Sequence, residues 1–228
     1  GAMVLTGIAG ILIGSPVLRL RGDYLAIMTI AFGQIVQAII LNASDLTNGS
    51  QGLYGIPTIM TFPIAFWTTV IIVTIIFLFM NSRHGRAILS IREDEIAAES
   101  VGINVSKYKL LGFVIASMFA AVGGSVFAFS IGFIAPTSFD FMASIEIFVI
   151  VVLGGMGSIT GSIIASILIV LLPEYLRAFD DYRYLIYSVS LILMMSFRPQ
   201  GLLGTKEFNI RKLFHINLKS KLVKGSDS

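Results

Sequence analysis

The sequence predicts an all-α protein that crosses a membrane several times. Of its 228 residues, 56% are hydrophobic and only 13% are charged, whereas about a quarter of the residues in a soluble domain carry charge. The apolar runs are long and continuous, as transmembrane helices require, and they lack the strand-like alternation that a membrane barrel needs. We therefore expect about six to seven membrane segments joined by polar connections.

The positive charges predict which connections face the cytoplasm. All but two of the sixteen Lys and Arg residues lie at Arg19 and Arg21, within residues 82–109, or in the tail that begins at Arg198. Loops rich in Lys and Arg stay on the cytoplasmic side of a membrane. Topology thus accounts for the basic residues, and we expect no binding to nucleic acid.

The composition also excludes several kinds of chemistry. The chain has no cysteine, which excludes disulfides, thiol catalysis and cysteine-ligated metals. Its two histidines, His84 and His215, are far apart and flanked by basic residues, so we expect no histidine metal site. No phosphate-binding loop of the form G-x-x-x-x-G-K-[ST] occurs. We therefore expect neither a cofactor nor an enzymatic activity.

The first part of the chain contains three apolar segments. Residues 3–18 form a short span, and a tight inner turn at residues 18–24 leads into a full-length span over residues 24–41. Residues 42–62 are rich in turn-forming residues and contain no Lys or Arg, which predicts a loop on the outer side. The span over residues 63–80 then returns the chain to the cytoplasm.

The span over residues 24–41 carries a polar stripe. Thr29, Gly33 and Gln37 are spaced four apart and Gln34 lies three before Gln37, so all four share one side of a helix. A buried amide in lipid needs a partner. The stripe therefore either forms hydrogen bonds with another helix or lines a wet pathway, and the sequence leaves both interpretations open.

Residues 82–109 form the long polar stretch between the spans. Asp94 is a good N-cap, residues 95–101 have helical propensity, and Gly102 stands where a left-handed C-cap would fall. These features predict a short docked helix, with an ordinary solvated loop as the alternative. The residues before it suit an interfacial helix whose basic side chains face lipid phosphate: Arg83, Arg86 and Arg92.

Residues 110–133 form the next span, which carries small residues at every fourth position. Such a ladder allows a neighbouring helix to approach closely; it consists of Gly112, Ala116, Ala120, Gly124, Ala128 and Gly132. After an outer connection at residues 134–143, residues 144–172 are too long for one comfortable span. We interpret them as two segments that meet at a glycine-rich turn in residues 154–161.

This turn and one carboxylate are candidates for a translocation path. Non-helical backbone at membrane depth survives only where protein or a water-filled cavity satisfies it, so Gly154, Gly155 and Gly157 mark either a pathway or a plain tight turn at the inner surface. Glu146 is the one carboxylate well inside an apolar run. It is a candidate proton or cation site, with a helix-end or paired carboxylate as the alternative.

The end of the chain completes the predicted topology. Residues 185–197 form a last span, and residues 205–228 form a basic cytoplasmic tail. Two crossings within residues 144–172 are needed to place this tail inside. The predicted permease domain therefore covers residues 1–204.

Five segments, spread in order over residues 18–203, together resemble a known family. They are residues 18–27 (LRLRGDYLAI), 46–57 (LTNGSQGLYGIP), 85–102 (from GRA to Gly102), 154–158 (GGMGS) and 198–203 (RPQGLL). In these segments the chain is similar to the permease subunits of branched-chain amino acid ABC importers, of the LivM type. Similar permeases are longer at the N-terminus, so we expect this chain to lack part of the transporter or to be a fragment.

The resemblance implies a permease subunit that moves branched-chain or related hydrophobic amino acids across the cytoplasmic membrane of a bacterium or archaeon. Its implied partners are ATP-hydrolysing subunits, a homologous second permease subunit, a periplasmic substrate-binding protein and membrane lipid. A urea-type or amide-type importer permease is an alternative. An ion-gradient-driven carrier that uses Glu146 and a structural membrane protein without transport are alternatives from other classes.

The resemblance further implies that residues 82–109 hold the coupling helix, which inserts into a groove on the ATPase. The importer loop signature is matched by Ala97, Ala98 and Gly102, but Ile96 stands where the wider signature has Glu, and Glu95 lies one place earlier. The residues expected to couple to the ATPase are Arg92, Asp94, Glu95, Ala97, Ala98, Glu99 and Gly102. Those expected along the translocation path are Thr29, Gln34, Gln37, Glu146, Gly154, Gly155 and Gly157.

Overall fold

The computed structural model describes residues 1–18, 23–175 and 189. The chain divides into two compact units, residues 1–143 and residues 144–228, and each is described by itself. Apart from Val189, the predicted last span at residues 185–197 lies outside the described residues, as does the predicted tail at residues 205–228.

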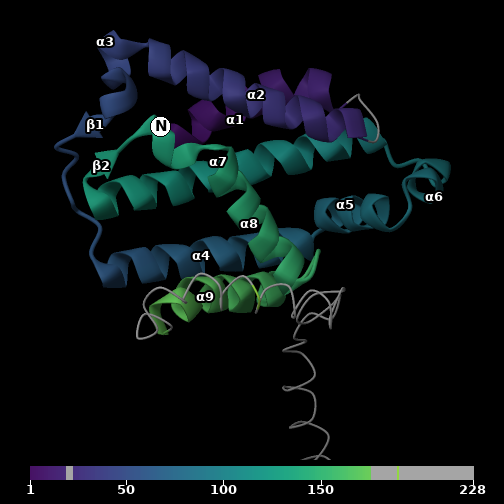
Figure 1. The fold of residues 1–228 in the computed structure, drawn as a ribbon. Coiled ribbons are helices and arrows are strands. Elements are labelled where there is room, and N and C mark those ends of the chain that lie inside the picture. The colour runs from purple at the N-terminus through teal and green to yellow at the C-terminus, as the bar shows by residue number, and fades with distance from the viewer. Residues whose placement is uncertain (19–22, 176–188, 190–228) are drawn as a thin grey trace, which may run out of the picture. The chain divides into compact units, whose positions relative to one another are not determined.

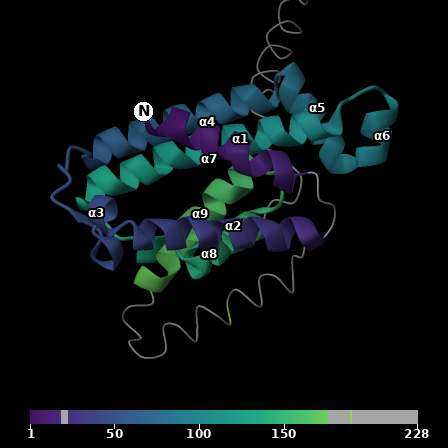
Figure 2. The ribbon, with the colours of Figure 1, turned by 90° about the horizontal axis from the view of Figure 1, so that it is seen from above.

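The first unit is built on four long apolar helices. Their axes are roughly aligned, and each helix is antiparallel to the one before it (Figures 1 and 2). They are α1 (Ala2–Val17), α2 (Asp23–Asn42), α4 (Phe62–Met80) and α7 (Val105–Ile131). The four apolar segments predicted for this unit are therefore helices, in the predicted order.

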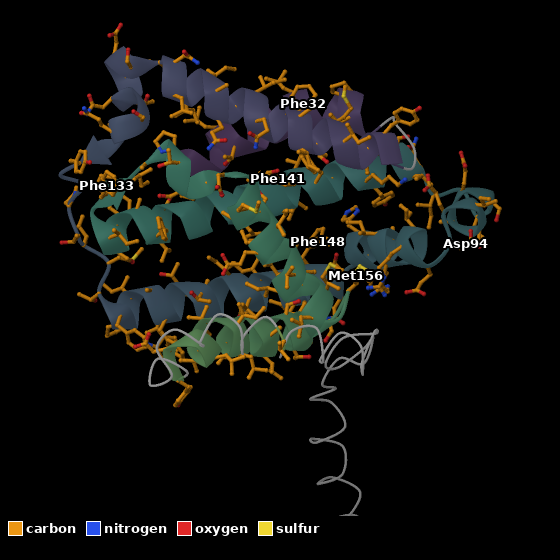
Figure 3. All side chains as sticks on the ribbon, viewed as in Figure 1. Phe32, Asp94, Phe133, Phe141, Phe148 and Met156 are labelled. Atoms are coloured by element: carbon orange, nitrogen blue, oxygen red, sulfur yellow. The ribbon has the colours of Figure 1, made fainter. Side chains whose placement is uncertain are left out.

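The connections between these helices gather at two opposite ends. Figure 3 shows Asp94 at one end, beside α5 (Arg83–Glu93) and α6 (Glu95–Ser100), and Phe133 at the other end. The end that contains Phe133 also holds α3 (Ser44–Thr47) and the short helices η1 (Gly49–Gln51) and η2 (Pro136–Phe139). The stretch rich in basic residues and the stretch without them thus lie at opposite ends, as the charge pattern predicts.

Helix α1 packs directly on α7 through three buried glycines. A methyl group built at Gly7 would lie 3.2 Å from Met118 Cγ, and one built at Gly14 would lie 2.9 Å from Phe113 Cδ1. Gly10 faces Ser117 in the same way, at 3.2 Å from its Oγ. Because glycine has no side chain, the α1 backbone can approach the side chains of α7 closely.

The predicted ladder of small residues on α7 does not make this contact. Ala116 and Ala120 are exposed, and a methyl group built at Gly124 would meet nothing within 4 Å. Within the first unit no helix covers the middle of the ladder, so a close approach at these positions stays a prediction. The close approach instead depends on the small residues of α1.

The outer connections pair in a small sheet that the sequence did not predict. Strands β1 (Leu53–Tyr54) and β2 (Phe133–Ile134) are antiparallel, with Leu53 opposite Ile134 and Tyr54 opposite Phe133. The rings of Tyr54 and Phe133 stack with their centroids 4.4 Å apart. This pairing ties the loop before α4 to the end of α7.

The second unit contains two apolar helices, α8 (Phe141–Gly154) and α9 (Ile159–Tyr175). Leu153, Ala165 and Ile169 form its buried core, and Val149 and Ile150 pack against it. The helices are separated at residues 155–158. The interpretation of residues 144–172 as two segments that meet at a glycine-rich turn is confirmed.

The described helices support a protein that crosses a membrane more than once. By length and composition, α4 and α7 could each span a membrane, and residues 27–42 with residues 44–51 would be a third span if that pair, bent by 78°, is counted as one. Three shorter apolar helices cover residues 2–17, 141–154 and 159–172. The predicted fold class, an all-α polytopic membrane protein, is confirmed.

Candidate functional site

Helix α6 is fixed at both of its ends. The Asp94 carboxylate accepts hydrogen bonds from the backbone N–H groups of Ile96 (2.9 Å) and Ala97 (3.0 Å), so it acts as the predicted N-cap. At the other end Gly102 has φ +85°, a left-handed conformation that glycine adopts without strain. Its N–H donates to the Glu99 carbonyl at 3.0 Å. The predicted short helix and both of its end signals are confirmed.

One side of α6 is anchored to its neighbours. Ala98 is 3% exposed and belongs to a small apolar core with Ile91 of α5 and Val105 of α7. Ile103 and Tyr108 pack against this core. Since the side chains come from three elements, α6 is held in place by packing as well as by its caps.

Glu95 is held by an ion pair inside the chain. Its Oε2 lies 2.7 Å from Lys109 Nζ, in the first turns of α7. The two side chains are 43% and 33% exposed, so the pair contributes only about 0.5 kcal/mol to stability. The main effect of the pair is to hold the start of α6 against α7.

The remaining residues predicted for coupling lie at the surface. Arg92 pairs with its neighbour Glu93 at 2.6 Å. Ala97 and Glu99 are exposed, and Glu99 has no ion pair within the described part of the chain. The structure therefore brings the predicted coupling residues together on one short segment, but it divides them between internal contacts and the open surface.

Sequence reasoning missed two exposed apolar side chains on the same segment. Ile96 is 81% exposed and Val101 is 75% exposed. The signal was present, since both are β-branched residues in a polar stretch. The capping pattern alone does not say which side of a helix is covered, and so it could not separate them from buried residues.

Helix α5 is joined rigidly to the end of α4. Ser82 caps it by accepting a hydrogen bond from the Gly85 N–H at 3.2 Å. A methyl group built at Gly85 would lie 2.5 Å from the Met80 Cα, so no side chain fits there without a shift of the backbone. Arg86 bridges the same joint by donating to the Asn81 carbonyl at 2.6 Å. The predicted helix is confirmed, and its contact with lipid phosphate stays a prediction.

The polar stripe on α2 is split between internal bonds and the surface. Gln37 Nε2 donates to the Pro136 carbonyl at 3.2 Å, which links α2 to η2. Thr29 Oγ1 donates to the Leu25 carbonyl at 3.0 Å. Gln34 is exposed, and a methyl group built at Gly33 would meet nothing within 4 Å. Gln37 thus has a structural partner, whereas Gln34 and Gly33 face open space in the described chain.

The glycine-rich turn joins α8 and α9 by direct backbone contact. Gly155 and Gly157 have φ values of +106° and +97°, and a methyl group built at Gly154 would lie 2.5 Å from the Ser162 nitrogen. Ser158 is 1% exposed and accepts a hydrogen bond from the Gly161 N–H at 3.0 Å. The buried Ser158 hydroxyl is therefore satisfied by the chain itself.

Within the described residues, Glu146 forms no ion pair. Its side chain is exposed on α8. Among the described residues, no group of three or more His, Asp or Glu side chains could hold a metal ion. A role for Glu146 in ion binding stays a prediction.

Comparison with known proteins identifies the family. Residues 1–195 match the family described as "Branched-chain amino acid transport system / permease component". The chain belongs to this family. The resemblance seen in the sequence is confirmed, and the family is one of transport permeases.

Two relatives within this permease family cover much of the chain. It is 38% identical to the high-affinity branched-chain amino acid transport system permease protein LivM of Salmonella typhimurium, over all of this chain and 60% of that protein. It is 39% identical to the protein of the same name from Escherichia coli, over 89% of this chain and 56% of that protein. The chain thus spans less than two thirds of the length of these relatives.

More distant members include an archaeal protein. The probable branched-chain amino acid transport permease protein LivM of Methanocaldococcus jannaschii is 25% identical over 90% of this chain and 68% of its own length. No solved structure matches the chain.

Proposed function

We propose that this chain is a transmembrane permease subunit of an ATP-binding cassette importer. It would move branched-chain or related hydrophobic amino acids across the cytoplasmic membrane of a bacterium or archaeon. The match over residues 1–195 and the printed names of the LivM relatives support the transport class. In this proposal the chain has no enzymatic activity and needs no cofactor.

The observation that carries the coupling part of the proposal is the anchored helix α6. It lies at the end of the first unit where residues 82–109 gather (Figure 1), and the Lys and Arg residues of that stretch as a whole predict the cytoplasmic side. A fixed helix with one covered and one open side suits a rigid-body contact with a moving partner. We assign to this contact the segment from Arg92 to Gly102, within a cytoplasmic loop over residues 82–109.

The proposed path for the substrate uses the exposed part of the α2 stripe and the glycine-rich turn. Gln34 is exposed at the α2 surface, and Gly154, Gly155 and Gly157 allow the tight turn of the second unit. Thr29, Gln37 and Glu146 complete the proposed set. The permease domain would cover residues 1–204, followed by a basic tail at residues 205–228.

The proposed partners follow from the transporter class. They are two ATP-hydrolysing subunits, a homologous second permease, a periplasmic substrate-binding protein and the surrounding lipid. ATP-driven closure of the ATPase subunits would move α6, and the packed helices would carry the movement to the path.

An uptake assay tests the function. The chain is co-expressed with an ATPase, a second permease and a binding protein of a branched-chain amino acid importer, and uptake of labelled leucine and of urea is measured in proteoliposomes. We expect leucine uptake that requires ATP and a functional ATPase and that survives collapse of the proton gradient.

Three outcomes contradict parts of this proposal. Uptake of urea but not leucine contradicts the substrate class. Uptake that needs no ATPase and collapses with the proton gradient contradicts the ABC class and favours a carrier that uses Glu146. Absence of any uptake in a complete complex, together with a gain in stability and no other effect when Gln34 and Gln37 are replaced by Leu, favours a structural protein.

A further inference from the structure

Helix α5 carries two arginines on the side opposite its packed side. At 100° per residue, Arg83 and Arg86 lie about 60° apart around the helix axis, and both are exposed. The other half of the helix is covered. Gly85 lies against the last turn of α4, and Ile91 is buried beside Val105 of α7. The two arginines therefore contribute nothing to the apolar packing of the first unit.

Neither arginine is neutralised by a carboxylate. The sequence contains no Asp or Glu from residue 46 to residue 92. Among the described residues, Arg83 and Arg86 form no ion pair, and Glu93, the next carboxylate along the chain, already has one. Arg86 donates one hydrogen bond to the Asn81 carbonyl. Since a guanidinium group has five N–H donors, this bond leaves it able to bind an anion as well.

The length of α4 places the two arginines at the level of the lipid headgroups. This helix has 19 residues, about 28 Å, which is close to the thickness of the hydrocarbon core. Its last turns are apolar, with Leu78 65% exposed. The first turn of α5 follows at once, because Gly85 packs directly on the Met80 backbone, and α5 lies past the end of α4 (Figures 1 and 2). Arg83 and Arg86 are thus the first charges beyond the core.

Arg92 does not belong to this surface. It lies on the side of α5 opposite Arg83 and almost two turns beyond Arg86, and so further from the end of α4. It is also paired with Glu93 at 2.6 Å. The structure therefore separates Arg83 and Arg86 from the third arginine that the sequence suggested for contact with lipid phosphate.

The chemistry of this surface fits an anionic phospholipid. Residues three apart on a helix have Cβ atoms about 5–6 Å apart, so Arg83 and Arg86 can reach one phosphate together. Guanidinium groups bind phosphate through paired N–H···O bonds, and the cytoplasmic leaflet supplies anionic lipids. The exposed Leu78 offers an apolar surface for acyl chains next to the arginines. A free phosphate ion would make no use of that apolar surface.

We propose that Arg83 and Arg86 form a binding site for one anionic phospholipid. The lipid phosphate lies between the two guanidinium groups, and the acyl chains lie along the last turns of α4. The bound lipid holds the joint between α4 and α5 at the headgroup layer. The inference rests on the membrane fold, and it is independent of the transported substrate and of the partner subunits.

A lipid titration tests the site. The full chain in detergent is titrated with phosphatidylglycerol or with phosphatidylcholine, and native mass spectrometry counts the lipids bound to each chain. The first phosphatidylglycerol should bind about tenfold more tightly than phosphatidylcholine, because each arginine near the headgroups attracts the anionic lipid. In Arg83→Gln with Arg86→Gln, the two affinities should agree to within about twofold. The absence of any preference in the wild-type chain overturns the inference.

A matched control separates a site from diffuse surface charge. Arg92→Gln with Lys107→Gln removes the same number of positive charges from exposed side chains at the same end of the first unit. This variant should keep the preference for phosphatidylglycerol. An equal loss of preference in the control and in Arg83→Gln with Arg86→Gln overturns the assignment, since the lipid would then sense net charge alone.

Folding and geometry are checked with two further variants. Arg83→Gln alone leaves the hydrogen bond from Arg86 to Asn81 in place and should still weaken phosphatidylglycerol binding several-fold, with the size-exclusion profile of the wild-type chain. Arg83→Lys with Arg86→Lys keeps both charges and should recover only part of the affinity, because an ammonium group cannot bind phosphate through a planar fork. Wild-type affinity in Arg83→Gln contradicts a site shared by two arginines.

Two competing occupants give different results. Millimolar inorganic phosphate should not displace the bound lipid; displacement that depends on Arg83 and Arg86 identifies a site for free phosphate and overturns the lipid assignment. Unchanged lipid binding in Arg83→Gln with Arg86→Gln, together with reduced retention of co-expressed transporter subunits, identifies an acidic protein surface as the occupant and also overturns it. Either result leaves the proposed transport function intact.

Discussion

The carbonyl group of Gly154 lies directly against Gly161, so the last turn of α8 and the first turn of α9 touch through backbone atoms. No side chain separates the helices at this point. The α8–α9 junction therefore depends on two positions where even a methyl group does not fit.

Replacing Gly161 by Ala tests this contact. The new methyl group would overlap the Gly154 carbonyl. Because that carbonyl belongs to the backbone and cannot move aside as a flexible side chain can, we expect a loss of about 2–4 kcal/mol. Thermal unfolding in detergent, followed by the fluorescence of the single tryptophan, Trp67, measures it. The control is Gly123→Ala, where the methyl group meets nothing within 4 Å and should be neutral or stabilising. Equal stability of the two variants would contradict the described junction.

Replacing Gly14 by Ala tests the packing of α1 on α7. The added methyl group would lie 2.9 Å from Phe113 and 3.0 Å from Leu110. These are side-chain atoms that can shift, so we expect a smaller loss of about 1–2 kcal/mol. The same unfolding assay measures it, with Gly124→Ala on the open side of α7 as control. A destabilised control with an unaffected Gly14→Ala would mean that α1 lies on the other side of α7.

Replacing Asp94 by Ala tests the N-cap of α6. Two backbone N–H groups lose their acceptor, which costs about 1 kcal/mol of helix stability. Hydrogen exchange should accelerate at the amides of Ile96 and Ala97 and remain unchanged within α4. Asp94→Asn should behave nearly as wild type, because an amide oxygen also caps helices. Protection that is unchanged in Asp94→Ala would exclude this cap.

Replacing Gln37 by Leu tests whether its structural role differs from that of Gln34. The variant loses the hydrogen bond to the Pro136 carbonyl and should lose about 0.5–1.5 kcal/mol of stability. Gln34→Leu removes an exposed amide and should change stability by less than about 0.5 kcal/mol. Unfolding midpoints measure both. If the Gln34 variant were the less stable one, the described α2 face would be rotated.

Much of the fold was predictable because it depends on local signals. The apolar run lengths located α4 and α7, and the Lys and Arg pattern assigned their ends. Asp94 and Gly102 located α6 to within a residue, since capping acts over three or four positions. The same holds for the break after Gly154, where no single helix could continue.

Contacts between distant segments were not predictable from one sequence. The pairing of Tyr54 with Phe133 joins loops about 80 residues apart, and each strand has only two residues, too few for a period-2 pattern. The ladder that begins at Gly112 predicted a close helix approach on α7, whereas the close contact seen in the first unit is made by the glycines of α1. A spacing of four identifies a helix face, but it does not say which neighbour covers it.

In the candidate coupling site, too, the local features were predictable from the sequence and the contacts between distant residues were not. The sequence located the segment, but it grouped Glu95 with Glu99 as equivalent carboxylates. Only the fold brings Lys109 to Glu95 and leaves Glu99 open. Long side chains fourteen residues apart pair only when a turn returns the chain, and that turn is a tertiary feature.

Helix α7 is unbroken from Val105 to Ile131. Its first turn shares a core with α6, and its last residue leads into the strand that pairs with Leu53 and Tyr54. In the proposed topology, this one continuous helix would therefore extend between the two sides of the membrane. A tilt applied at the α6 end of α7 would then displace the other end of α7 in the opposite direction, where it leads into the small sheet.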